Sequence, residues 1–222
     1  MTSLNQSTEL AAPGLHGESE AIDTALEYTR ALDGRALDEW LRRAAARVGI
    51  PVFIESVAVP FLRRVGDEWY EQRISPAQEH LASSTVHDII VETMRACARE
   101  NSAPKVVVAT MAEERHVIGA ALVGAAAAME GWSVVYLGAD VPAADIARAA
   151  RISDARVVAV SIVYVDEGER VLREVQMLRT LLAGDVRLIT GGSGAISLAR
   201  GISSLGVPVE SSVGGLFAAL KA

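Results

Sequence analysis

The sequence predicts an N-terminal all-α four-helix bundle followed by a doubly wound α/β domain, Rossmann-like and flavodoxin-like, with a five-stranded parallel sheet. Two observations carry this prediction. Apolar residues recur at helical spacing up to about residue 100, with no strand signal between them. From about residue 105, short Val/Ile-rich runs alternate with helical stretches, which is the pattern of a parallel sheet wrapped by helices.

The same change of pattern divides the chain. Residues 1–17 are rich in Ser, Thr, Gly and Pro without periodicity, so we expect a disordered tail there. The predicted bundle covers 18–100, the linker 101–104 and the α/β domain 105–222. The expected bundle helices reach about residue 34 and then run over 36–48, 51–74 and from 75 onward. Pro60 is expected to kink or divide the third helix, whereas Ser75 and Pro76 open the fourth.

In the second domain, strands and helices are expected to alternate. The strands are predicted at 106–109, 134–137, 157–160, 187–189 and 207–209. The helices are predicted at 117–129, 143–150, 169–182, 195–199 and from 216. Sheets of this type bind ligands outside the carboxyl ends of their strands, so the loops that follow the strands are the place to look for a site.

Composition excludes several classes of protein. The net charge is −7 and no segment is rich in Lys and Arg, so we expect no direct binding of nucleic acid. No apolar run is long enough to cross a bilayer without charges, and the first residues lack the pattern of a signal peptide. The single Cys97 excludes an internal disulfide. We therefore expect a cytoplasmic protein without a membrane segment.

The loop after the first predicted strand carries the strongest candidate for a ligand. It has no glycine-rich phosphate loop, which argues against a nucleotide. Glu114 stands two residues before His116, and a metal-ligating histidine commonly donates its other ring N–H to a carboxylate. A lone loop histidine is more often a solvated side chain. Small or polar residues also follow the later strands, so the strand ends together predict a long slot.

These loops resemble the cobalamin-binding domain shared by methionine synthase, the corrinoid mutases and photoreceptors of the CarH/LitR type. That family is marked by a D/E-x-H-x-x-G loop, an S-x-L or S-x-V strand end and a later Gly-Gly pair. The matching residues are Glu114, Arg115, His116, Val117, Ile118 and Gly119, then Ser161 and Val163, then Gly191 and Gly192. The match runs from about Lys105 to the end of the chain, with Glu114 in place of the commoner Asp.

The resemblance implies a role for each part of the slot. His116 becomes the lower axial ligand of the cobalt once the benzimidazole of the cofactor has left the metal. Ser161 bonds the displaced base, and Gly191 and Gly192 make room for the nucleotide tail.

The predicted bundle carries a second resemblance. Nine residues separate Trp69 from the pair Glu79-His80, and this W-x9-E-H pattern is similar to that of CarH-type photoreceptors. In those proteins the three side chains line the pocket of a 5′-deoxyadenosyl upper ligand, so adenosylcobalamin is the expected form. Taken alone, Trp69 is as well explained by helix packing, and Glu79 and His80 by a solvated helix start.

Two departures from the photoreceptor pattern stand out. Some of these proteins have a histidine directly after the tryptophan, where this chain has Tyr70. His80 is then the candidate ligand of the cobalt after photolysis. The MerR-like DNA-binding domain common to the family is expected to be missing, since only a short tail precedes the bundle. Standalone relatives include photocobilins, which hold a bilin beside the corrin, so biliverdin is an alternative second chromophore.

The expected function is light sensing without enzymatic activity: photolysis of the upper-ligand bond changes bundle packing or self-association and signals to a downstream protein partner not identified by the sequence. The resemblance implies a homo-oligomer, with a dimer as one form. An alternative is a corrinoid methyl-carrier protein of a methyltransferase system, which needs no Trp69, Glu79 and His80 cap. A third interpretation is a flavodoxin-like regulatory domain without a corrin.

Overall fold

The computed structural model describes residues 15–97, 103–211, 215 and 219. The chain forms two compact units, Met1–Val86 and His87–Ala222, which meet inside one long helix, α5 (Pro76–Ala96). The last turns of α5 belong to the second unit because Met94 lies against Gly124: a Cβ on Gly124 would come within 2.6 Å of the Met94 sulfur. The expected linker at 101–104 lies beyond this helix and partly outside the described residues.

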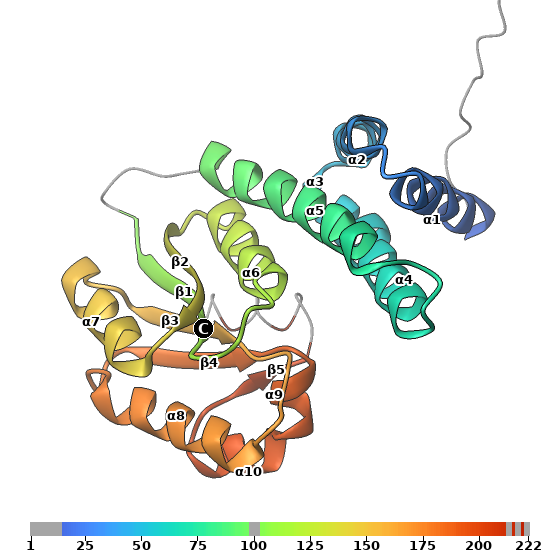
Figure 1. Cartoon of the computed structure of the whole chain (residues 1–222). Helices are drawn as coiled ribbons and strands as arrows, with labels where there is room; N and C mark the ends of the chain where they lie inside the picture. Colours follow the sequence, from blue (N-terminus) through green and yellow to red (C-terminus); the bar gives the residue numbers. More distant parts are fainter. Residues whose placement is uncertain (1–14, 98–102, 212–214, 216–218, 220–222) are drawn as a thin grey trace, which may run out of the picture. The chain divides into compact units, whose positions relative to one another are not determined.

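The first unit is helical, as predicted (Figure 1). Its elements are α1 (Leu15–Arg30), α2 (Gly34–Val48), α3 (Ile50–Phe53), η1 (Ile54–Ala58), α4 (Val59–Tyr70) and the first part of α5. The expected tail is too long, since Leu15–Gly17 belong to α1. The third predicted helix is also too long at its end, because α4 stops at Tyr70 and a turn leads to α5.

Pro60 neither breaks nor ends its helix. The segment just before it, η1, is a π-helix, in which the N–H of Val59 bonds back to the carbonyl of Ile54. Pro60 then stands in the first turn of α4, directly after this wider turn. The helix therefore continues through the proline with one wide turn.

Local capping explains where the other helices begin. The Asp33 side chain accepts the N–H of Ala36 at 3.0 Å and caps α2. Ser75 and Gln78 form a reciprocal pair at the start of α5: the Ser75 N–H donates to Oε1 of Gln78 at 2.7 Å, and the Gln78 N–H donates to Oγ of Ser75 at 3.4 Å. The sequence signal at Ser75-Pro76 is thus confirmed as a helix start.

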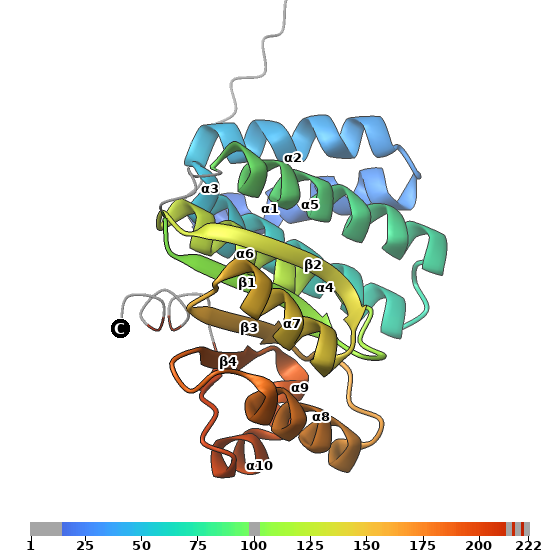
Figure 2. The ribbon, with the colours of Figure 1, turned by 90° about the vertical axis from the view of Figure 1, so that its left-hand side faces the viewer.

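The second unit is a five-stranded, all-parallel sheet with helices on both faces, as predicted (Figure 2). Its strands are β1 (Lys105–Met111), β2 (Ser133–Val141), β3 (Val157–Ser161), β4 (Arg187–Gly191) and β5 (Val209–Glu210), in the order β2-β1-β3-β4-β5. Its helices are α6 (Ile118–Met129), α7 (Ala143–Ser153), α8 (Gly168–Leu181), α9 (Ser193–Ser197) and α10 (Ala199–Ser204).

Two expected elements of this unit differ in detail, and a third is not tested. The fifth strand is shifted, because it was placed at 207–209 and is formed by Val209–Glu210. The helix expected at 195–199 is two short helices, α9 and α10, separated by Leu198. The helix expected from residue 216 lies outside the described residues.

The Val/Ile runs build a core on each face of the sheet. Val107 and Ala109 of β1 point into a cluster with α7 and α8, whereas Val106 and Val108 point to the other face, with α6. All four are completely buried, which explains why the strand reads as a continuous apolar run. No described helix is both long enough and apolar enough to span a bilayer.

Candidate functional site

The carboxyl ends of three strands lie in register and end in polar or small residues. Thr110 of β1 pairs with Ser161 of β3, and Ser161 pairs with Gly191 of β4. Thr110 and Ser161 are buried although they are polar, which contrasts with the apolar residues before them. The loops that leave these strands therefore start from one edge, where open parallel sheets hold their ligands.

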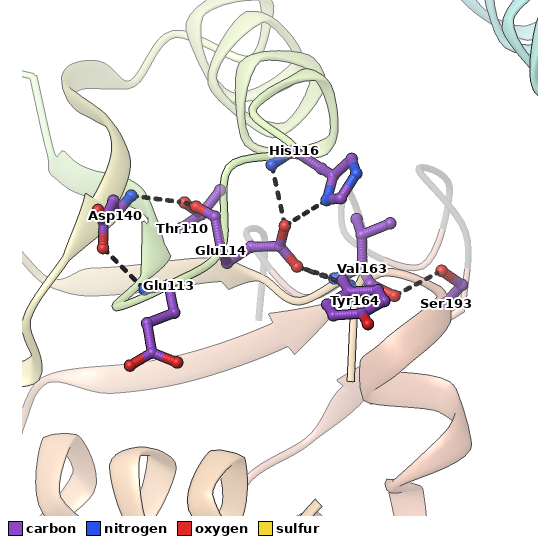
Figure 3. Close-up of polar contacts among 8 residues, drawn as sticks. All are labelled: Thr110, Glu113, Glu114, His116, Asp140, Val163, Tyr164 and Ser193. Carbon is purple, nitrogen blue, oxygen red and sulfur yellow. Dashed lines mark hydrogen bonds and ion pairs between the residues drawn. The ribbon is translucent and has the colours of Figure 1, made fainter. Parts of the chain in front are cut away.

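Glu114, in the β1–α6 loop, ties this edge together (Figure 3). Its carboxylate is 5% exposed and accepts four hydrogen bonds. The Oε1 atom takes the backbone N–H of His116 at 2.9 Å and the ring Nδ1 at 2.6 Å. The Oε2 atom takes the backbone N–H groups of Val163 and Tyr164, each at 2.7 Å. One side chain thus joins the loop after β1 to the loop after β3.

These contacts keep the carboxylate ionised. Burial alone would raise the pKa of Glu114, but the N–H groups of Tyr164, His116 and Val163 and the ring of His116 outweigh it and hold the pKa below its usual value. An ionised carboxylate accepts hydrogen bonds only, so the ring nitrogen that faces it, Nδ1 of His116, carries the hydrogen. The other ring nitrogen, Nε2, then has a free lone pair.

The His116 ring is exposed, so this lone pair is accessible to a ligand from outside the protein. Its side chain is 61% exposed, and within the described residues Nε2 has no hydrogen-bond partner. A single exposed histidine with one ring nitrogen fixed by a carboxylate suits a metal whose other ligands come from a macrocycle, as in haem proteins with one axial histidine.

Ser161 supplies a second observation that fits a ligand at this edge. Its Oγ is buried and has no hydrogen-bond partner among the described residues. Gly119, in the first turn of α6, lies directly above it, and a Cβ at position 119 would collide with this Oγ. An orphaned hydroxyl in a glycine-lined cradle fits a ligand that brings its own polar atom.

Two glycines at the end of β4, Gly191 and Gly192, allow backbone segments to approach closely at the same edge. Gly192 has a φ of 101°, a conformation that disfavours side chains, and a Cβ there would collide with the carbonyl of Ile162. A Cβ on Gly191 would lie 3.2 Å from the Glu210 carbonyl oxygen. Both positions keep the backbone of the β3 and β4 loops close together, with no side chain to fill the space.

The remaining residues of the motif frame the histidine. Arg115 is exposed, whereas Val117 and Ile118 are half-buried. Val117 is the N-terminal cap residue of α6 and Ile118 is its first residue. Val163 contributes its N–H to Glu114, and its carbonyl accepts the Ser193 hydroxyl at 3.2 Å.

The predicted residues of the helical unit lie near the turn between α4 and α5. Trp69 is 51% exposed and Tyr70 is 85% exposed. They line an open hollow of about 400 Å³ together with Gln72, Ile74 and Pro76. Two aromatic side chains thus form part of the wall of this hollow.

Glu79 and His80 repeat the arrangement at His116. Nδ1 of His80 lies 2.6 Å from Oε2 of Glu79, and the His80 side chain is 81% exposed. In both pairs a carboxylate faces Nδ1 and leaves Nε2 for another partner.

Sequence reasoning missed four contributors to the loop. Thr110 donates its hydroxyl to the Glu114 carbonyl and accepts the Asp140 N–H at 3.1 Å. Tyr164 places its ring 6.5 Å from the His116 ring, centre to centre. Asp140 and Arg170 hold the neighbouring Glu113. Two of them carried a usable signal: Thr110 is a polar residue at the end of an apolar strand, and Asp140 lies in a Leu-Gly-x-Asp-Val-Pro turn that the cobalamin-binding family shares.

Family comparisons agree with this geometry. Residues 104–207 match a B12 binding domain family, and residues 21–91 match a second B12 binding domain family. The chain is 29% identical over 179 residues to the HTH-type transcriptional repressor CarA of Myxococcus xanthus, and 30% identical over 177 residues to the repressor CarH of the same organism. Each alignment covers 79% of this chain, which spans 59% of CarA and 58% of CarH.

A solved structure shows the same fold. The monomethylamine corrinoid protein of Methanosarcina barkeri superposes with a TM-score of 0.72, at 16% identity, over 91% of this chain and 98% of that protein. With two matched domains in succession, the chain is a cobalamin-binding protein that resembles the CarA and CarH repressors.

Proposed function

We propose that this chain is a cobalamin-dependent light sensor in which His116 is the lower axial ligand of the cobalt. The observation that carries the proposal is the pair Glu114–His116, in which a buried carboxylate fixes Nδ1 at 2.6 Å and leaves Nε2 exposed. The orphaned Ser161 Oγ supports it independently, because it needs a polar partner from outside the described residues.

Each residue at the edge of the sheet has a distinct task in this proposal. Glu114 orients the His116 ring and fixes its tautomer, which leaves Nε2 for the metal. The Ser161 hydroxyl bonds the base that leaves the metal, and Gly119 keeps the way to that hydroxyl open. Gly191 and Gly192 are assigned to the nucleotide tail. Arg115, Val117, Ile118 and Val163 complete the walls of the slot.

In the helical unit, the proposal assigns Trp69, Glu79 and His80 to the upper ligand. Adenosylcobalamin, when bound, supplies a cobalt–carbon bond that visible light cleaves. The half-exposed indole of Trp69 has a flat face for a purine, and the Glu79 carboxylate can accept ribose hydroxyls. Glu79 binds Nδ1 of His80 and leaves Nε2 available. His80 is therefore the residue proposed to bind the metal after the upper ligand has dissociated.

The signal follows from packing. Loss of the upper ligand removes a partner from Trp69, and a change of packing at one site can shift a helical element between two arrangements. The proposed outputs are a change in bundle arrangement or in self-association, as a dimer or larger homo-oligomer, read by a partner protein. The role is signalling, with no reaction catalysed on a substrate.

The experiment is light-dependent absorption of the reconstituted protein. Adenosylcobalamin is bound in the dark and the spectrum is taken before and after green light. We expect a conversion in the wild type and loss of the His116-ligated spectrum in His116→Ala. His87→Gln is the matched control, because His87 bonds Tyr136 at 3.1 Å, away from the β1–α6 loop. An unchanged spectrum with the adenosyl form bound would end the proposal.

One observation keeps a second function in view. Tyr70, at the position where some photoreceptors have a histidine, is 85% exposed and presents no imidazole. A corrinoid methyl carrier needs the slot but not a second histidine. Methyl transfer from the loaded protein to a thiol acceptor, with a partner enzyme, would favour that function over light sensing.

The chromophores are decided by extraction. Protein from cells supplied with cobalamin and biliverdin is denatured, and the released pigments are identified by mass and spectrum. Cobalamin alone supports the simple sensor, whereas an equimolar bilin adds biliverdin as the second chromophore.

A further inference from the structure

Two side chains from other elements, Asp140 of β2 and Arg170 of α8, bind the β1–α6 loop close to His116. From β2, the Asp140 carboxylate accepts the backbone N–H of Glu113 at 2.7 Å. From α8, the Arg170 guanidinium lies 3.1 Å from the Glu113 carboxylate and donates to the carbonyl of Ala112 at 3.4 Å. Figure 3 shows Asp140 and Glu113 on one side of the loop and His116 on the other.

The loop needs such support because its backbone is unusual. Glu113 has a φ of 67° and Asp140 a φ of 57°, both in the left-handed region that non-glycine residues rarely adopt. Conformations of this kind persist only where the surroundings fix them. The two unusual residues bond each other, and the N–H of Asp140 also donates to the Glu114 carbonyl at 3.1 Å.

Arg170 is suited to hold this loop. Its side chain is 24% exposed, and it faces Asp166 at 3.1 Å as well as Glu113 and Ala112. A guanidinium can serve several acceptors in one plane, whereas a lysine offers a single compact charge. The contact joins the first turn of α8 to the loop, so α8 becomes part of the support behind Glu114.

We infer that Asp140 and Arg170 are positioning residues that hold residues 112–116 in the conformation that presents His116 before any cofactor arrives. The two form a clamp on Glu113 and leave His116 untouched. This inference rests on the proposed role of His116 as the cobalt ligand. It adds that the position of His116 is fixed in advance by contacts of Asp140 and Arg170 with Glu113 and Ala112, none of which involves His116 itself. Preorganisation reduces the ordering cost of binding, so the clamp adds to cobalamin affinity.

The first test measures the loop in the protein without cobalamin. Backbone amide exchange of Glu113 and His116 is followed by NMR in the wild type, Arg170→Ala and Asp140→Gly. Glycine accommodates the positive φ and lacks only the acceptor, so Asp140→Gly isolates the hydrogen bond. We expect hydrogen exchange at both amides to become about tenfold faster in each variant. Local opening of the loop costs less free energy when the contacts of Asp140 or Arg170 no longer have to be broken.

Two further variants serve as controls. Arg173→Ala removes an exposed guanidinium of the same helix, one that pairs with Glu169 at 3.7 Å on the surface, and should leave both amides unchanged. Asp140→Asn keeps an oxygen acceptor and tolerates the left-handed conformation, so it should exchange like the wild type. If Arg170→Ala does not fold, Arg170→Lys takes its place and should show the same change in smaller measure.

The second test is cobalamin binding. Arg170→Ala and Asp140→Gly should weaken cobalamin binding about tenfold, the smaller end of the loss seen when a residue that supports a ligating histidine is removed. At saturating cobalamin, both variants should still show the spectrum of the His116-ligated cofactor. Unchanged exchange and unchanged affinity in both variants would overturn the inference. A wild type whose spectrum does not depend on His116 would overturn the proposed function instead, and the exchange data would still decide whether the clamp holds the loop.

Discussion

Glu114 and His116 are joined twice, because one carboxylate oxygen accepts both the backbone N–H of His116 at 2.9 Å and its ring Nδ1 at 2.6 Å. The same side chain reaches across to the N–H groups of Val163 and Tyr164 with its other oxygen. The orientation of one imidazole is thereby coupled to the backbone of a second loop. Two substitutions separate these roles.

Glu114→Gln should impair the histidine. A neutral amide is a poorer acceptor for Nδ1–H than a carboxylate, so the orientation and the tautomer of the His116 ring are less well fixed. We expect cobalamin affinity to fall by about 10- to 100-fold, measured by equilibrium dialysis. Glu169→Gln, which alters an exposed glutamate of α8, is the control. Equal affinity of Glu114→Gln and the control would contradict the assigned role.

Glu114→Asp should impair the loop instead. A side chain shorter by one methylene can stay close to its neighbour His116, but not also to Val163 and Tyr164, which then lack an acceptor. We expect the His116-dependent spectrum to persist and the free energy of unfolding to fall by about 1–2 kcal/mol, measured with urea. Loss of the spectrum in this variant would show that the long side chain is needed by the histidine itself.

Ser161→Ala should have opposite effects on the free and the loaded protein. The buried Oγ has no partner among the described residues, so removing it relieves the cost of an unmet hydroxyl. The free energy of unfolding without cobalamin should rise by about 1 kcal/mol, whereas cobalamin affinity should fall. Ser204→Ala, whose hydroxyl bonds the Gly201 carbonyl at 2.6 Å, is the control and should lose stability.

Glu68 gives a prediction about pH in the helical unit. Its carboxylate is 1% exposed and faces Arg30, Arg64 and Arg73 at 2.6, 3.3 and 2.9 Å. The hydrogen bond from Arg73, opposed by burial and reinforced by Arg30, lowers the pKa of Glu68 to about 2. Because this pKa is depressed on folding, its stabilisation is complete above pH 4.5 and is lost as the pH falls towards 2.

Glu68→Gln should therefore destabilise the protein near pH 7 and flatten its acid response. The three guanidinium groups are almost half exposed, so we expect a loss on the order of 2 kcal/mol rather than the full value of the pKa shift. Urea unfolding at pH 7, 4 and 3 measures it. A variant that loses as much stability as the wild type between pH 4 and 3 would count against this account.

The proposed contact of Trp69 with the upper ligand is tested by comparing the affinity of the protein for two forms of cobalamin. Trp69→Ala removes the flat wall of the hollow near Gln72 and Ile74. We expect the preference for adenosylcobalamin over hydroxocobalamin to fall by about tenfold, the value of one lost aromatic contact. Trp40→Ala, a half-buried indole of α2, is the control. An unchanged preference would remove Trp69 from the upper-ligand site.

The sequence could predict what depends on short spacing or strong periodicity. The parallel sheet followed from its Val/Ile runs, and the pair Glu114–His116 from an interval of two residues. It could not predict that Glu114 also binds Val163 and Tyr164, since those bonds use backbone N–H groups 49 and 50 residues away, which any residue could supply. The clamp by Asp140 and Arg170 was hidden because its side chains reach the loop from positions 27 and 58 residues further along the chain.

Pro60 shows a different limit. Its missing N–H correctly marked a disturbance in the helix, but the sequence left open whether the chain would kink, stop or accommodate it. The π-helical turn before it resolves the conflict locally, since the widened turn ends where the proline begins. Such a solution depends on the packing of buried neighbours such as Phe53 and Phe61, which periodicity alone does not describe.

That widened turn, η1, holds one residue more than an α-helical turn would. Because a π-helix has more residues per turn than the roughly 3.6 of an α-helix, the extra residue at Ile54–Ala58 adds little rotation to the helix that follows. A variant that lacks one residue of this turn should therefore form ordinary α-helix there and leave the indole of Trp69 facing in nearly the same direction. The orientation of the aromatic wall is thus insulated from a change of one residue in the length of its own helix.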